Sequence, residues 1–159
     1  MRPRDVAWLR AVVDTSSLVR AALSADSAAG RLIGKFSSAD SDSQIVVSSD
    51  ILSELMGVLE RPKFSQRLAP ERRRRFLLHL QATAFFVVPE HRVEVCRDPA
   101  DNMVLEAALA SGDDVIIISD DRDLLILDPW RDIRIVKPEA ALAMYEERQP
   151  ANRNRGAQP

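Results

Sequence analysis

Four carboxylates stand at positions where the sequence pattern would bring them to one point: Asp14, Glu54, Asp101 and Asp121. Asp14 ends the apolar run Ala11–Val13, and Asp121 closely follows the apolar run 115–118. In a parallel α/β sheet, ligands bind beyond the carboxyl ends of the strands. Carboxylates gathered there repel one another unless a cation holds them, and such oxygen ligands suit Mg²⁺ or Mn²⁺. Metal-assisted phosphodiester chemistry is therefore the first hypothesis.

Short apolar runs alternate with helical patterns along the chain. We expect strands at residues 9–14, 45–47, 85–88, 115–118 and 133–136. Apolar residues at helical spacing predict helices at about 16–24, 27–36, from Ser48 or Ser49 to Pro62, from Pro70, from Asp98 to Gly112, and at 138–147. This alternation predicts a three-layer α/β/α fold with a central, mainly parallel sheet. The run 115–118 is the most apolar and should be central, whereas 133–136 should lie near an edge.

The chain length of 159 residues favours one domain, which we place at residues 9–147 between flexible termini at 1–8 and 148–159. The single cysteine, Cys96, excludes an internal disulfide, and the two histidines do not stand at zinc-ligand spacing. No apolar stretch is long enough to span a bilayer, and no signal-type segment follows the charged start. We therefore expect a cytoplasmic protein with no membrane association.

The net charge of −2 conceals an uneven distribution of charge. Residues 61–97 carry nine basic side chains against three acidic ones, whereas residues 98–128 carry nine acidic side chains against one basic. A nuclease needs acids for metal and bases for phosphate, but many solvated surfaces show the same contrast. The run 72–75 is more often a solvated helix face; in the minority reading Arg72, Arg73 and Arg75 contact RNA phosphates.

Several of the acids also have ordinary structural roles to fill. Asp14 could cap the following helix, although its position after a strand favours a ligand. Glu54, taken alone, reads as a surface residue. Asp98 is assigned mainly to capping the helix that follows it, and Asp101 mainly to metal. Among Asp120, Asp121 and Asp123, an Asp-rich turn is the simple reading, and Asp121 is favoured as the functional residue.

Four segments in order resemble the PIN-domain family over about residues 11–145, and most closely the toxin-type (VapC-like) proteins of bacterial toxin–antitoxin pairs. They are Val12-Val13-Asp14-Thr15-Ser16; Ser48 to Leu55, followed by Arg61-Pro62-Lys63-Phe64; Arg97 to Asn102, followed by Leu105-Glu106-Ala107-Ala108; and Ile118 to Leu125. Each segment alone is weak, but their order and spacing together are specific. One position departs from the pattern, because Ser16 stands where the family usually has Asn.

The resemblance implies a metal-dependent endoribonuclease that cleaves single-stranded RNA, with one or two Mg²⁺ or Mn²⁺ ions. It makes Asp14, Glu54, Asp101 and Asp121 the metal-binding catalytic acids. Asp98, Asp123, Ser119 and Ser16 would support them, with Ser119 as a small hydroxyl beside the site. It also implies an antitoxin protein that covers the acidic site, and a homodimer.

Other functions remain open from the sequence. A degenerate PIN domain would bind RNA or protein without cleaving RNA, and the departure from the family pattern at Ser16 leaves this alternative open. A receiver domain would also have an acid after its first strand, a hydroxyl such as Ser119 and a Lys-Pro such as Lys137-Pro138. However, the run 85–88 ends in Pro89-Glu90 without a phosphate-accepting Asp. A haloacid-dehalogenase phosphatase would need a second Asp where Ser16 stands.

Overall fold

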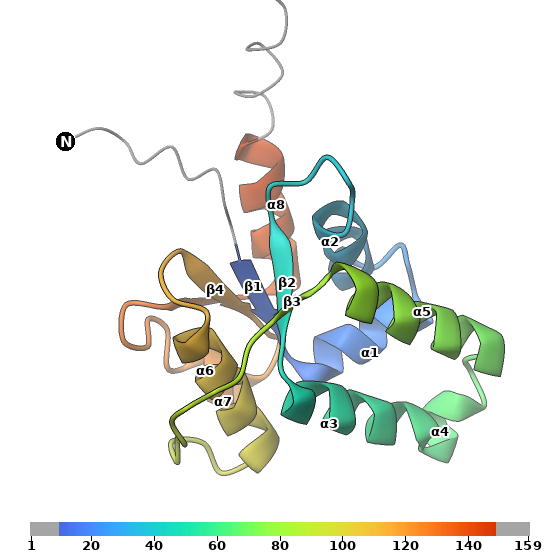
Figure 1. Cartoon of the computed structure of the whole chain (residues 1–159), viewed down its shortest axis with the longest axis horizontal. Helices are drawn as coiled ribbons and strands as arrows, with labels where there is room; N and C mark the ends of the chain where they lie inside the picture. Colours follow the sequence, from blue (N-terminus) through green and yellow to red (C-terminus); the bar gives the residue numbers. More distant parts are fainter. Residues whose placement is uncertain (1–9, 149–159) are drawn as a thin grey trace, which may run out of the picture.

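A computed structural model describes residues 10–148, and its centre is a sheet of five parallel strands (Figure 1). The strands stand in the order β3-β2-β1-β4-β5, and every neighbouring pair is parallel. Their bounds are β1 Arg10–Val13, β2 Gln44–Val47, β3 Phe85–Phe86, β4 Val115–Ile118 and β5 Arg134–Val136. The expected edge position of β5 is confirmed, and β4 is an interior strand beside β1, which occupies the middle of the sheet.

Eight helices connect and cover the strands in the described part of the chain. They are α1 Thr15–Leu23, α2 Ala28–Phe36, α3 Ser49–Glu60, α4 Pro62–Ser65, α5 Pro70–Thr83, α6 Pro99–Ala110, α7 Arg122–Leu125 and α8 Pro138–Arg148. In Figure 1, α6 lies on one side of the strands, and α2 and α5 lie on the other. The three-layer α/β/α fold predicted from the sequence is thus confirmed.

The interior strands β1 and β4 explain why the sheet needs a helical layer on each face. All four residues of β4 are buried, as are Ala11, Val12 and Val13 of β1. Strands that are apolar on both faces must be covered on both. Val13 pairs with Ile118, and the Asp14 N–H donates to the Ile118 carbonyl at 3.0 Å. Because of this register, β1 and β4 end side by side, and the residues that follow them lie at the same edge of the sheet.

Three local features differ from the sequence-based expectation. Strand β3 has two residues instead of the four expected at 85–88, because Val88 turns to solvent (85% exposed) before Pro89. Pro62 ends α3, as predicted, but also begins the short helix α4, where its missing N–H is harmless. Helix α7, which begins directly after Asp121, stands where the sequence predicted only an Asp-rich turn.

The predicted flexible termini, 1–8 and 148–159, lie outside the described residues, apart from Arg148 at the end of α8. Within residues 10–148, no helix is long and apolar enough to cross a membrane.

Candidate metal centre

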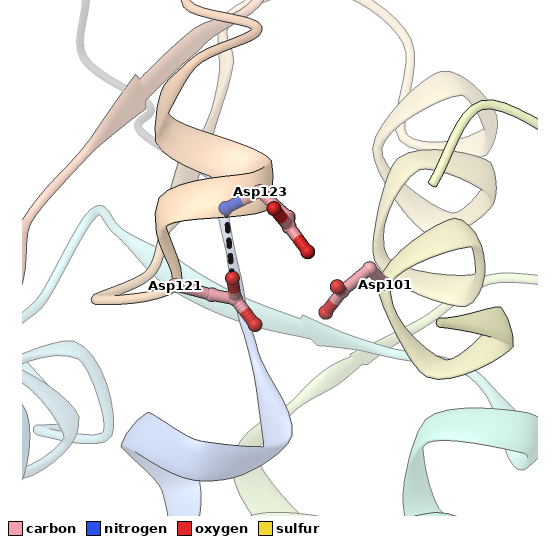
Figure 2. Close-up of side chains that lie close together, drawn as sticks. All are labelled: Asp101, Asp121 and Asp123. Atoms are coloured by element: carbon pink, nitrogen blue, oxygen red, sulfur yellow. Dashed lines mark hydrogen bonds between the residues drawn. The ribbon is translucent and has the colours of Figure 1, made fainter. Parts of the chain in front are cut away.

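Three aspartates bring their carboxylates together beyond the ends of the strands (Figure 2). Asp101 reaches in from the first turn of α6, and Asp121 and Asp123 come from the start of α7. One carboxylate oxygen from each lies within 4.8 Å of those of the other two. Asp121 also caps α7, because its side chain accepts the Asp123 N–H at 2.8 Å. This cap fixes the direction in which Asp121 enters the cluster.

Asp101 is the member of this cluster that most needs a cation. Its side chain is only 7% exposed, and its Oδ2 atom has no hydrogen-bond partner among residues 10–148. Burial, followed by the like charge of Asp121, raises the pKa of Asp101 to about 7. A buried, unpaired carboxylate oxygen is unfavourable unless something neutralises it. A hard divalent cation held by oxygen ligands would do so, and the donor set present fits such an ion.

Asp14 is tied to the same site through Ser119. The Asp14 side chain accepts the Ser17 N–H at 2.9 Å and so caps α1. Its second oxygen accepts a hydrogen bond from the fully buried Ser119 hydroxyl, which in turn accepts the Asp121 N–H at 2.9 Å. Burial raises the pKa of Asp14, although these hydrogen bonds oppose the shift. Capping and a place in the acidic site are therefore compatible for Asp14.

A cavity of about 510 Å³ joins all four acids that the sequence singled out. Asp14, Glu54, Asp101 and Asp121 line it, and so do two of the predicted supporting residues, Asp98 and Ser16. Glu54 enters from α3 and is half-buried. Asp98 caps α6 by accepting the Ala100 N–H at 3.0 Å, the role expected for it. The structure thus gathers the four acids around one space, with two of them inside the tight cluster.

Two neighbouring aspartates are engaged by arginines instead. Asp120 pairs with Arg20 at 2.6 Å, so that arginine balances its charge, and Asp120 itself does not line the cavity. Asp123 pairs with Arg97 at 3.2 Å, but that arginine is 89% exposed, and exposed ion pairs contribute little. Asp123 therefore remains available to the cluster.

Two polar residues of α6 that the sequence analysis quoted without a role hold the segment leading to the site. Asn102 accepts the Val95 and Cys96 N–H groups at 3.0 and 2.8 Å. Glu106, one helical turn later, is buried and accepts the Val93 N–H at 2.9 Å. Their i,i+4 spacing on one helix face was the available signal. Together they fasten the irregular stretch between β3 and α6 that ends at Asp98.

Replacing Glu106 by Ala should lower the free energy of unfolding by about 1–3 kcal/mol, because the buried Val93 N–H would lose its acceptor. Glu106→Gln keeps an acceptor and should have the smaller effect. Urea denaturation followed by circular dichroism measures both. Equal stability of the Ala variant and the parent protein would refute this role.

Comparison with known proteins supplies a family. A family model described as "PIN domain" matches residues 10–123, which contain β1 to β4 and all the acids described above. No curated protein matches the chain.

Proposed function

Because the chain belongs to the PIN-domain family, we propose that it is a metal-dependent endoribonuclease acting on single-stranded RNA. PIN domains are generally nucleases and typically use divalent metals, so the proposal narrows a known type of activity to one substrate class. The observation that carries it is the buried Asp101 side chain, which has an oxygen without a partner among the described residues and which lies close to two further carboxylates.

Under this proposal, Asp14, Glu54, Asp101 and Asp121 hold Mg²⁺ or Mn²⁺ at the cavity. A divalent ion in such a site supplies Lewis-acid stabilisation of charge on the phosphate and makes water a better nucleophile near neutral pH. Ser119 positions two of the acids at once, since its hydroxyl contacts both the Asp14 side chain and the Asp121 backbone. Loss of such a supporting contact typically lowers metal affinity or activity by about ten- to a hundredfold.

The finer assignment to toxin-type PIN proteins is supported by the four ordered sequence segments. It brings with it two proposed partners, an antitoxin that covers the acidic cavity and a second copy of the chain. An acidic pocket suits a partner that offers arginine or an apolar helix. We also propose that residues 9–147 form a single domain and that the protein acts on RNA in the cytoplasm.

The direct test is cleavage of an end-labelled, mixed-sequence single-stranded RNA with Mn²⁺, with Mg²⁺ and with a chelator. We expect cleavage with metal and none with the chelator. Cleavage that persists in the chelator would exclude the metal-dependent mechanism. The absence of cleavage with either metal would favour a PIN domain that only binds, consistent with Ser16 standing at the cavity in place of the usual Asn.

A further inference from the structure

The acidic cavity extends past the carboxylates to a wall of different chemistry. Its apolar lining there comes from Val19 and Leu23 of α1 and from Val58 of α3. Arg61, Phe64 and Arg67, which lie in and around α4, complete the lining. We call these three residues the α4 wall. One continuous space therefore has acids at one part and guanidinium groups beside an aromatic ring at another.

The two arginines of the α4 wall carry unneutralised charge. Neither Arg61 nor Arg67 makes a side-chain hydrogen bond or an ion pair with any residue between 10 and 148, and both are exposed. By contrast, Arg20 lines the same cavity but is paired with Asp120. Free guanidinium groups at the edge of a cavity attract anions and bind phosphate oxygens in a forked geometry.

Local structure holds the α4 wall in place. The Phe64 N–H donates to the Arg61 carbonyl at 2.9 Å, and the Arg67 N–H donates to the Phe64 carbonyl at 2.9 Å. Leu68, which directly follows the wall, is fully buried and also donates to the Phe64 carbonyl, at 3.0 Å. The segment is thus a compact turn anchored in the core. The half-buried Phe64 is presented to the cavity from a fixed backbone.

We propose that the α4 wall binds the nucleotide adjacent to the phosphate that is cleaved at the acids, with Arg61 and Arg67 on backbone phosphates and Phe64 stacked on the base. This inference rests on the proposed nuclease function and deepens it. Aromatic stacking combined with basic contacts to the backbone is the general way in which proteins hold single strands. A base can reach Phe64 only when it is unpaired, so the wall selects single-stranded substrate.

Two observations favour a nucleotide over a protein segment as the occupant. The wall and the acids share one cavity, so a nucleotide next to the phosphate cleaved at the acids can lie against the wall. The cavity, at about 510 Å³, lies in the range that encloses ligands of this size. Arg72 and Arg75, in contrast, line a separate hollow with Ala21, Ala22 and Phe76, away from the acids.

The test is equilibrium binding of a fluorescein-labelled single-stranded RNA, measured by anisotropy in chelator so that binding is separated from cleavage. We expect Arg61→Gln and Arg67→Gln each to weaken binding about tenfold and to reduce the slope against log salt by about 0.7. Phe64→Ala should weaken binding about tenfold without changing that slope, and Phe64→Trp should restore it. An abasic strand of equal length should be insensitive to Phe64→Ala.

Arg74→Gln is the matched control, because Arg74 is exposed on α5 and lines neither hollow. It removes the same charge and should change the affinity by about twofold or less, since Arg74 lies outside the cavity and salt screens its charge from the bound strand. An equal loss for Arg74→Gln and Arg67→Gln would overturn the proposal. So would an equal effect of Phe64→Ala on the abasic and the intact strand.

The two proposals fail in different ways. Metal-dependent cleavage together with unchanged binding by the wall variants rejects the α4 wall and keeps the nuclease. Binding that depends on the wall without cleavage under any metal rejects the nuclease and keeps the wall as an RNA site. If the parent protein does not bind RNA at all, the wall proposal is rejected, and a protein partner becomes the occupant to test.

Discussion

Replacing Asp14 by Asn is expected to lower kcat/KM for RNA cleavage by about a hundredfold or more while the fold remains intact. Loss of a residue that merely orients a metal ligand costs about ten- to a hundredfold, so loss of a ligand should cost at least as much. Asn still accepts the Ser17 N–H, because Asn is as good a helix cap as Asp. Thermal stability without metal should be unchanged or higher, since a buried charge with a raised pKa is removed.

The matched control for this variant is Asp120→Asn. Asp120 stands beside Asp121 in the sequence but is paired with Arg20 and does not line the cavity. It should keep cleavage within about tenfold of the parent protein, because the pair it breaks is solvent-exposed. Single-turnover rates with Mn²⁺ and circular dichroism melting curves would be collected for all three proteins. Undiminished cleavage by a folded Asp14→Asn protein would contradict the assignment of Asp14.

The metal-free protein is expected to lose stability as the pH rises from about 4 to about 7, and divalent metal should restore it. Burial and the like charges around it raise the pKa of Asp101 from 3.8 to about 7. In that window the folded state binds more protons than the unfolded state, so the free energy of unfolding falls with rising pH. The raised pKa of Asp14 acts in the same direction. A cation needs the deprotonated acids, so Mg²⁺ should stabilise the protein most at the upper end of this range.

Melting temperatures at about pH 5 and about pH 8, each with chelator and with Mg²⁺, would measure this effect. Asp101→Asn should flatten the pH dependence in chelator and reduce the stabilisation by Mg²⁺ at high pH. A melting temperature in chelator that rises through neutral pH would show that the pKa of the Asp101 carboxyl is not raised. A Mg²⁺ effect of the same size at both pH values would count against a site built from these acids.

The fold was predictable because β1 and β4 are apolar on both faces, and such runs alternating with helices admit few arrangements. The meeting of Asp14 with Asp121 followed from the same logic, since both stand just after adjacent parallel strands. The position of Glu54 at the site could not be predicted in this way, because it does not follow a strand. Its position at the cavity depends on how α3 packs, which its own neighbours in the sequence do not reveal.

Other features could not be derived from local pattern because they depend on contacts between distant segments. The segment that contains α4 is anchored by the buried Leu68 that follows it, and no apolar periodicity marks a four-residue helix. The stretch before Asp98 has no regular structure to predict, and only the folded position of α6 brings Glu106 to Val93. The pairing of Arg97 with Asp123 likewise joins side chains 26 residues apart.

The position of β1 between β2 and β4 has a consequence for how the protein is made. Asp14 is synthesised before β4, which is one of the two strands that complete its sheet environment and lies about a hundred residues later in the chain. Ser119, which holds Asp14, and Asp121 follow β4, so an unfinished chain has no assembled acidic site. Contacts of such long sequence separation form only once the intervening chain is in place. Under the proposed function, ribosome-bound fragments and truncated products would therefore be harmless to the RNA around them.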